Sequence, residues 1–243
     1  MSTVTDPHRH NLRLGVSKTL PLLLGLIPFG LAYGILATQA GLTVIETMAM
    51  SLIVFAGASQ FMAVGMFAAA ADPFTIILST WLINLRHLVM GLSLSPYLAK
   101  VGPWWQRMLA FGMADEVYLT TITHYREQQI DRGADQGADQ GSPHFMLGSA
   151  IVLYIGWAAT SLTGALVGRA ISDPLAWGLD FAMPATFVTM LLPLIVSWRT
   201  ATVVAVSAVT ATATYVLVPG KWYIIVAVVV ATTVGVLLEE HQP

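Results

Sequence analysis

The sequence has no cysteine and few charged residues for its length. The absence of cysteine among 243 residues excludes disulfide bonds, thiolate metal sites and thiol redox chemistry. Charged residues make up 10% of the chain, whereas a soluble domain carries about 25%. The net charge of -2 offers no basic surface for nucleic acid. With 56% hydrophobic residues, the composition predicts a polytopic membrane protein.

Motifs of catalysis and nucleotide binding are also missing. The chain contains no Gly-x-Ser-x-Gly elbow, no Walker loop and no His-Glu-x-x-His zinc motif. The missing Walker loop argues against transport powered by the chain's own ATP hydrolysis. We therefore expect neither an enzyme nor a resident cofactor or metal ion.

The N-terminal stretch is polar and shows no cleavable signal before the first apolar run. We expect the chain to be inserted whole into the cytoplasmic (inner) membrane as a multi-pass protein. Arg9, Arg13 and Lys18 would hold its start in the cytoplasm by the positive-inside rule. The C-terminus is expected on the same side.

Eight apolar segments of helix length predict an all-α membrane bundle, because a spanning helix needs about 20 residues. They cover 20–38, 44–70, 74–97, 107–124, 146–168, 175–196, 201–218 and 222–238. A polar stretch at 125–144 contains the duplication Gly-Ala-Asp-Gln and is predicted to be a flexible linker. It separates an N-terminal transmembrane half, 1–124, from a C-terminal half, 145–243. Together the halves form one membrane domain.

The two halves resemble each other at an offset of 126 residues. Phe-Ala-Gly-Ala-Ser-Gln-Phe at 55–61 aligns with Phe-Ala-Met-Pro-Ala-Thr-Phe at 181–187, and Gly30 aligns with Gly156. Interrupted apolar segments at corresponding positions of two halves are typical of a transporter's binding site. If all eight segments cross, the halves are parallel repeats. If 44–70 and 175–196 enter and leave on one side, the halves are inverted repeats. The inverted arrangement places one more Lys or Arg inside, so the positive-inside rule mildly prefers it.

Arg86 is the most informative residue, because it lies inside the apolar run 74–97 within Asn84-Leu-Arg-His87. An arginine at the bilayer centre costs about 2.5–3.5 kcal/mol on insertion scales, so it needs a partner or a water-filled cavity. It could bind a substrate carboxylate or pair with Asp115 or Glu116. It could also extend to the membrane interface.

Four more polar residues, near Arg86 or in the next segment, are candidates for substrate binding or coupling. Asn84 and His87 are three residues apart and share a helix face, and histidine suits proton coupling. A structural hydrogen-bonding role for His87 is the alternative. Asp115 and Glu116 are adjacent acids in the segment 107–124 and could carry a proton. Alternatively they are solvated caps of a peripheral helix.

The interrupted segments supply the remaining candidates. Gly57 could open its helix beside Ser59 and Gln60, or these small residues could serve close helix packing. In the second half, Asp180 could cap a half-helix, where the helix dipole favours an acid. Pro184 and Thr186 lie in the same block.

Several blocks together resemble the AzlC family, the large subunit of the branched-chain amino acid export system, also called the LIV-E family. The blocks occur in family order over about residues 12 to 238. They are Gly-Leu-Ile-Pro-Phe-Gly-Leu-Ala-Tyr-Gly at 25–34, the block at 55–61, Trp-Leu-Ile-Asn-Leu-Arg-His at 81–87, Asp115-Glu116, and Asp-Phe-Ala-Met-Pro at 180–184. The resemblance implies efflux of leucine, isoleucine and valine, with methionine as a further candidate. It also implies a small hydrophobic partner subunit of the AzlD type.

The resulting hypothesis is a proton-driven secondary exporter of branched-chain amino acids. Phe55, Phe61, Phe181 or Phe187 could form the wall of its apolar pocket. The alternatives are a passive channel or carrier for another small solute, and a non-transporting structural or regulatory membrane subunit.

Overall fold

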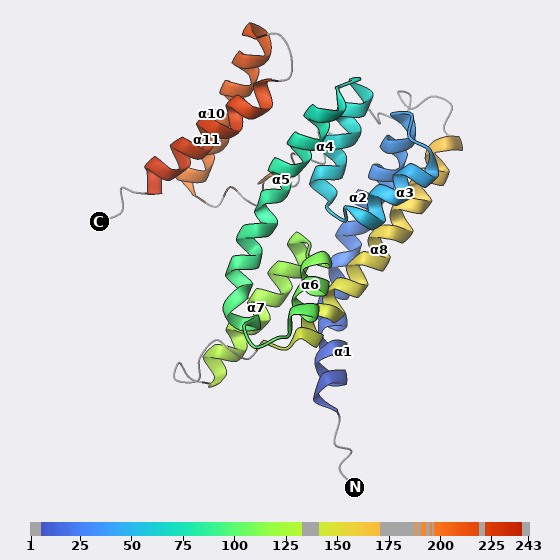
Figure 1. Cartoon of the computed structure of the whole chain (residues 1–243), viewed down its shortest axis with the longest axis vertical. Coiled ribbons are helices and arrows are strands. Elements are labelled where there is room, and N and C mark those ends of the chain that lie inside the picture. The colour runs from blue at the N-terminus through green and yellow to red at the C-terminus, as the bar shows by residue number, and fades with distance from the viewer. Residues whose placement is uncertain are drawn as a thin grey trace.

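The computed structural model describes residues 6–132, 141–170, 188, 191–192, 195, 197–218 and 222–239. These residues are almost entirely helical and contain no strand, so the predicted all-α class is confirmed (Figure 1). The helices are α1 (Pro7–Thr19), α2 (Leu23–Gln39), α3 (Val44–Ile53), α4 (Gly57–Ala68), α5 (Pro73–Leu94), α6 (Pro103–Phe111), α7 (Asp115–Arg132), α8 (Pro143–Ala170), α10 (Trp198–Leu217) and α11 (Trp222–Glu239). Short 3₁₀ turns η1 (Leu20–Leu22) and η2 (Ser95–Leu98) extend α1 into α2 and lengthen α5.

Four of the described helical stretches are long and apolar enough to cross a membrane. They are Pro7–Gln39, Pro73–Leu98, Pro143–Ala170 and Trp198–Leu217. The other helices of the main body are shorter or more polar. The predicted segments 44–70 and 107–124 therefore do not form single spanning helices.

Two of the spanning stretches, α1–α2 and α8, pack against each other and run in the same direction. Leu12 approaches Gly148 near their beginnings, and Gln39 Nε2 donates a 2.8 Å hydrogen bond to Gly168 O at their ends. Between these points, a Cβ atom on Gly34 would overlap the backbone of Ser161. Small residues let the two backbones pack this closely.

This parallel pairing does not confirm the expected inverted repeats. α2 and α8 correspond at the offset of 126, and inverted repeats would make such a pair antiparallel. The chain between them makes one full return crossing, through α5, so α8 starts on the same side as α1 (Figure 1).

The segment 44–70 forms a re-entrant hairpin of two half-helices, α3 and α4. With 10 and 12 residues they are only about 15–18 Å long, too short to cross a 30 Å core. Thr47 O near the start of α3 accepts a 3.0 Å bond from Tyr33. The turn and the start of α4, residues 54–58, form what we call the first tip. It lies against the middle of α8, where Phe55 contacts Tyr154 and Gly57 approaches Trp157.

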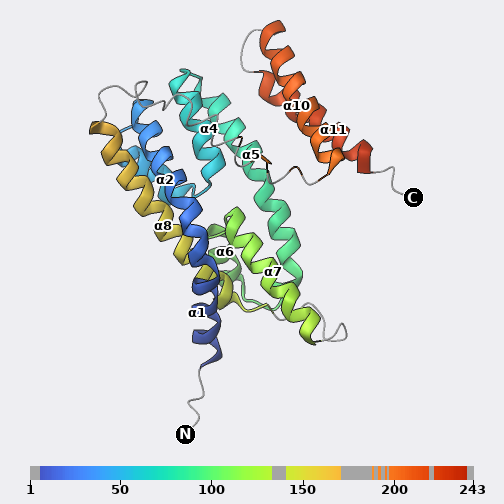
Figure 2. The ribbon, with the colours of Figure 1, turned by 180° about the vertical axis from the view of Figure 1, so that it is seen from behind.

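A second hairpin, α6–α7, enters from the opposite side. Its base is fixed beside the start of α8, because Tyr125 Oη donates a 2.7 Å bond to Ser142 O. Its turn and the start of α7, residues 112–116, form the second tip. Gly112 lies beside Ala150 in the middle of α8, and the preceding Phe111 lies near Tyr154. Figures 1 and 2 show the two hairpins extending toward each other from the two ends of the bundle.

The second hairpin corrects two sequence predictions. Residues 107–124 are not one helix, because the chain turns at 112–114. Helix α7 then continues through Arg132 into the range 125–144 that was predicted as a loop. Its Glu, Gln and Arg residues favour helix.

The C-terminal helices α10 and α11 pack on each other as an antiparallel hairpin, with the Tyr215 and Tyr223 rings 5.6 Å apart. They confirm the apolar segments 201–218 and 222–238 as helices. Most of the segment 175–196 lies outside the described residues.

Candidate functional site

The two tips meet at a cavity of about 310 Å³, which we call the central cavity. This volume is at the lower end of the range for small-molecule sites. Its lining comes from η1, α2, both tips, α5 and α8. The residues are Leu22, Gly25, Leu26, Phe29, Phe55, Ala56, Gly57, Ala58, Arg86, His87, Ala114, Asp115, Glu116, Leu153 and Trp157.

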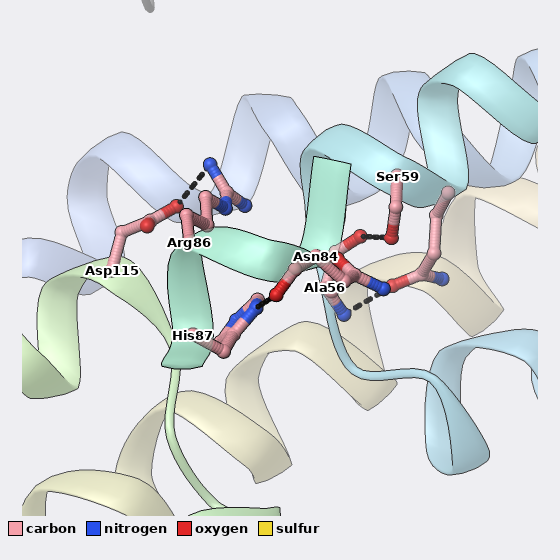
Figure 3. Close-up of polar contacts among 7 residues, drawn as sticks. Ala56, Ser59, Asn84, Arg86, His87 and Asp115 are labelled. Carbon is pink, nitrogen blue, oxygen red and sulfur yellow. Dashed lines mark hydrogen bonds and ion pairs between the residues drawn. The ribbon is translucent and has the colours of Figure 1, made fainter. Parts of the chain in front are cut away.

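The first tip is held by its own polar side chains. Ser59 Oγ donates to Ala56 O at 2.9 Å, and Gln60 Oε1 accepts from Ala56 N at 3.1 Å. Gln60 Nε2 donates to Ser51 Oγ at 3.4 Å. Ser59 and Gln60 are fully buried and do not line the cavity. Both residues therefore fix the break between α3 and α4, as Figure 3 shows for their bonds to Ala56.

The same tip presents backbone donors to the cavity. Helix α4 begins after Ala56 with no side-chain cap, and Gly57 and Ala58 line the cavity. Phe55 adopts φ of 45°, an uncommon value for a residue with a side chain. The amide N–H groups of a first helical turn lack intrahelical partners and carry the positive end of the helix dipole. This end of the cavity suits an anion.

The second tip supplies negative charge. Asp115 and Glu116 form the first turn of α7 and line the cavity. The helix dipole stabilises carboxylates at this position. Their place in the lining of the cavity favours a role at the site over that of solvated caps of a peripheral helix.

Arg86 on α5 pairs with Asp115 across the cavity edge. Arg86 Nη1 lies 2.9 Å from Asp115 Oδ2, and the two side chains are 31% and 34% exposed. Figure 3 shows the two side chains facing each other from α5 and α7. Of the two acids expected as partners, Asp115 forms the pair, whereas Glu116 remains in the cavity. Arg86 Nε is buried without a hydrogen-bond partner among the described residues, so a donor is left over.

His87 and Asn84 differ in their access to the cavity. His87 lines it, and its Nδ1 lies 3.2 Å from the backbone oxygen of Asn84 (Figure 3). The Asn84 side chain is not part of the lining, and its Oδ1 is buried with no partner in the described part of the chain. His87 is thus the titratable group of α5 that faces the cavity beside Arg86.

The apolar walls include residues that sequence reasoning missed. Trp157 of α8 lines the cavity, stacks on Tyr33 at 5.6 Å and approaches Gly57. Leu26 and Phe29 of α2 face it as well. These side chains look like ordinary core residues in sequence, and no motif distinguished them.

The predicted aromatic wall is found in part. Phe55 lines the cavity, whereas Phe61 is buried between Phe29 and Tyr33. The second-half candidates Phe181, Phe187, Asp180, Pro184 and Thr186 lie outside the described residues.

Comparison with known proteins covers the larger part of the chain. The family model described as "AzlC protein" matches residues 21–171, a range that includes every residue lining the central cavity. The chain is 28% identical over 172 residues to the branched-chain amino acid transport protein AzlC of Bacillus subtilis (strain 168). That match covers 71% of this chain and 63% of the relative, so it spans less than two thirds of the relative's length.

A second relative is the inner membrane protein YgaZ of Escherichia coli (strain K12), which is 28% identical over 182 residues. The match covers 73% of this chain and 71% of that protein. An uncharacterized membrane protein of Archaeoglobus fulgidus is 26% identical over 183 residues, or 74% of each chain. No solved structure matches. Together with the apolar helices, these relatives identify the chain as a membrane protein.

Proposed function

This chain belongs to the AzlC family, and from that premise we propose that it is a secondary transporter that exports branched-chain amino acids. The main support for this proposal is the central cavity, in which an uncapped helix start, two carboxylates and an apolar wall face one space. A zwitterion with an aliphatic side chain needs these three kinds of surface.

The carboxylate of the substrate is assigned to the first tip. The N–H groups of Gly57 and Ala58 are the donors, because α4 starts there without a side-chain cap. Unwound helix starts at the middle of the membrane receive anionic groups in other transporters. Arg86 assists from α5 through its unpaired Nε.

The ammonium group is assigned to the second tip. Glu116 is the first candidate acceptor, because the Asp115 carboxylate is already engaged by Arg86. The distance between the two tips is bridged by the substrate's own backbone atoms. Both charges are then neutralised locally, as a low-dielectric site requires.

The aliphatic side chain is assigned to the apolar wall of Leu26, Phe29, Leu153 and Trp157. A polar side chain would lose hydrogen bonds to water there and gain none, at a cost of about 1–3 kcal/mol. A difference of one methylene is worth only about 1–3 kcal/mol in a hydrophobic pocket, so leucine, isoleucine, valine and methionine are expected to be accepted together.

Proton coupling is assigned to Glu116 and His87, the titratable groups in the cavity that do not form the ion pair. Protonation of Glu116 would remove the acceptor for the ammonium group. Proton binding and substrate binding would then compete at one site, as an antiporter requires.

Orientation and partner complete the proposal. Arg9, Arg13, Lys18, Lys100, Arg107 and Arg126 belong to elements at the end where α1 begins, and Arg169 belongs to the other end. The positive-inside rule supports a cytoplasmic N-terminus in the inner membrane. Export as the direction is expected from the family. A small hydrophobic subunit of the AzlD type is the expected partner from the family.

The test is efflux of preloaded labelled leucine from cells that lack their own exporters. The chain is expressed alone and together with an AzlD-type subunit. We expect efflux that needs the partner and collapses with a protonophore. Efflux that ignores the protonophore would indicate a passive path, and no efflux in either setting would contradict the proposed substrate.

A further inference from the structure

We propose that a second cavity, between α5, α6 and α8, is the path by which substrate reaches the central cavity from the side of the N-terminus. The contact between Met113 and Gly91 would be the barrier between the two spaces. This inference rests on the proposed function for the identity of the substrate. The presence of a water-filled path can be tested whatever the substrate is.

The second cavity, which we call the inner cavity, has a volume of about 190 Å³. It lies on the N-terminal side of the second tip, where α5 ends and α8 begins. Its lining is mainly aliphatic, with two polar residues, Ser95 and Gln106. The full set is Gly91, Leu94, Ser95, Leu98, Gln106, Leu109, Ala110, Met113 and Met146.

One face of α5 lines both cavities. His87 belongs to the central cavity, and Gly91, Leu94 and Leu98 belong to the inner cavity. These positions follow the three- and four-residue spacing that places side chains on a single helix face. A solute leaving the inner cavity along this face of α5 therefore arrives beside His87.

The second tip separates the two spaces. Met113 lines the inner cavity, whereas the next residue, Ala114, lines the central cavity. A Cβ atom added to Gly91 would meet the Met113 methyl group at 3.9 Å, and no other side chain or distant backbone of the described residues comes within 4 Å. The barrier at this point is therefore one flexible side chain opposite a residue that has none. Methionine changes rotamer readily, so a small movement joins the cavities.

The outer end of the inner cavity is polar. Ser95 and Gln106 are exposed, and Gln106 Nε2 donates to Leu98 O at 3.3 Å and to Val101 O at 2.9 Å. In contrast, Leu94 and Leu109 are each 2% exposed at the inner end. A polar mouth and an aliphatic interior suit a small amphiphilic solute, such as an amino acid with an aliphatic side chain.

The natural absence of cysteine makes this path directly testable. Leu94→Cys places a thiol in the buried wall of the inner cavity. Leu92→Cys is the matched control two residues away, because Leu92 is 64% exposed on the apolar outer surface of α5. Each variant is treated with a membrane-impermeant, water-soluble thiol reagent in inside-out and right-side-out vesicles that contain the whole transport complex.

We expect Leu94→Cys to react from the cytoplasmic side and Leu92→Cys to react from neither side, since lipid excludes the reagent. Leucine should slow the reaction at Leu94→Cys several-fold, and aspartate should not. No reaction at Leu94→Cys from the cytoplasmic side would overturn the path. Reaction without protection by leucine would uphold the path and contradict the proposed substrate, so the two failures are distinguishable.

A pair of methionine variants tests the barrier. Met113→Ala removes the side chain that faces Gly91, while Met146→Ala removes another buried methionine side chain from the wall that α8 contributes to the same cavity. We expect Met113→Ala to increase leucine exchange relative to Met146→Ala at equal protein level. Equal exchange in the two variants would show that Met113 is not the barrier.

Discussion

The two re-entrant hairpins enter from opposite ends of the bundle, and the polar groups at their tips find their partners in different ways. The first tip is neutral, and its bonds to Ser59 and Gln60 lie within its own hairpin. The second tip carries Asp115 and Glu116, and Asp115 is neutralised by Arg86 from another helix. The first tip is thus a self-contained binding element. The net charge at the second tip depends on the position of α5, because Arg86 on that helix neutralises Asp115. A movement of α5 relative to α7 would break this pair and leave the tip more negative.

This difference assigns separate roles to the tips. A tip fixed by internal hydrogen bonds holds its backbone donors in place without substrate. A tip whose charge is matched by a distant helix can respond to substrate and protons. The predictions below separate the two roles, starting with the largest expected effect.

The Arg86–Asp115 pair is the feature whose loss should be most damaging. Removing one partner of a buried ion pair leaves an uncompensated charge and costs about 3–5 kcal/mol. Exposure of about a third moderates this cost. Arg86→Ala and Asp115→Ala should each abolish leucine transport and lower the melting temperature. The exchanged pair Arg86→Asp with Asp115→Arg should recover part of the stability.

The ion pair between Lys18 and Glu127 is the matched control. Its atoms are 3.9 Å apart, and both side chains are more than half exposed. Such surface pairs contribute about 0–1 kcal/mol, so Glu127→Gln should leave transport and melting temperature nearly unchanged. Equal losses at both pairs would contradict the special role of the second tip.

Gln60 should affect both stability and leucine binding, because its hydrogen bonds fix the shape of the first tip. Gln60→Met keeps the volume but leaves the Ala56 N–H without its partner, at a cost of about 1–3 kcal/mol. Gln39→Met is the control, because the Gln39 amide makes its hydrogen bond to Gly168 O at the far end of α2, away from the cavity. Both variants should lose stability in thermal unfolding. Only Gln60→Met should weaken leucine binding, and unchanged binding would remove the first tip from the site.

Asp72 offers the smallest and most local test, since it caps α5 outside the cavity. Hydrogen bonds from the side chain and backbone of Thr75 hold the pKa of Asp72 below its ordinary value. A lowered folded-state pKa adds stability above the unfolded pKa, and that stability is lost as pH falls through the folded pKa. Asp72→Asn keeps a helix cap but has no carboxylate. At neutral pH it should be less stable than the natural chain, and the difference in the free energy of unfolding between the two proteins should shrink below about pH 4.

The readout is thermal unfolding as a function of pH, with Asp72→Ala as the variant that loses the cap altogether. Transport at neutral pH should be unchanged in Asp72→Asn. A change in leucine flux would show that the start of α5 contributes to the site, and would weaken the division of roles between the tips.

The sequence predicted the charged part of the site because charge at membrane depth is costly. Arg86 had to have a partner, and the acids of 107–124 were the nearest candidates. The break at Gly57 followed from polar residues inside an apolar run. Hydropathy did not indicate the break at 112–114, because the half-helices α6 and α7 read together as one marginal segment.

The direction of α8 and the apolar walls were not predictable for another reason. Repeat similarity between Gly30 and Gly156 carries no information on orientation, which depends on how many times the intervening chain crosses. Trp157 and Phe29 have the composition of any packed core, and only the three-dimensional position of the tips makes them part of a cavity.

The most direct test of the account is photo-crosslinking with a diazirine analogue of leucine. The whole transport complex in vesicles is irradiated with the analogue, and the modified peptides are mapped by mass spectrometry. We predict modification of the cavity-lining residues of the tips, 55–58 and 114–116, and of Trp157, and unlabelled leucine should prevent it. Modification confined to other parts of the chain, or labelling at the tips that excess leucine does not reduce, would contradict a substrate site between the two hairpins.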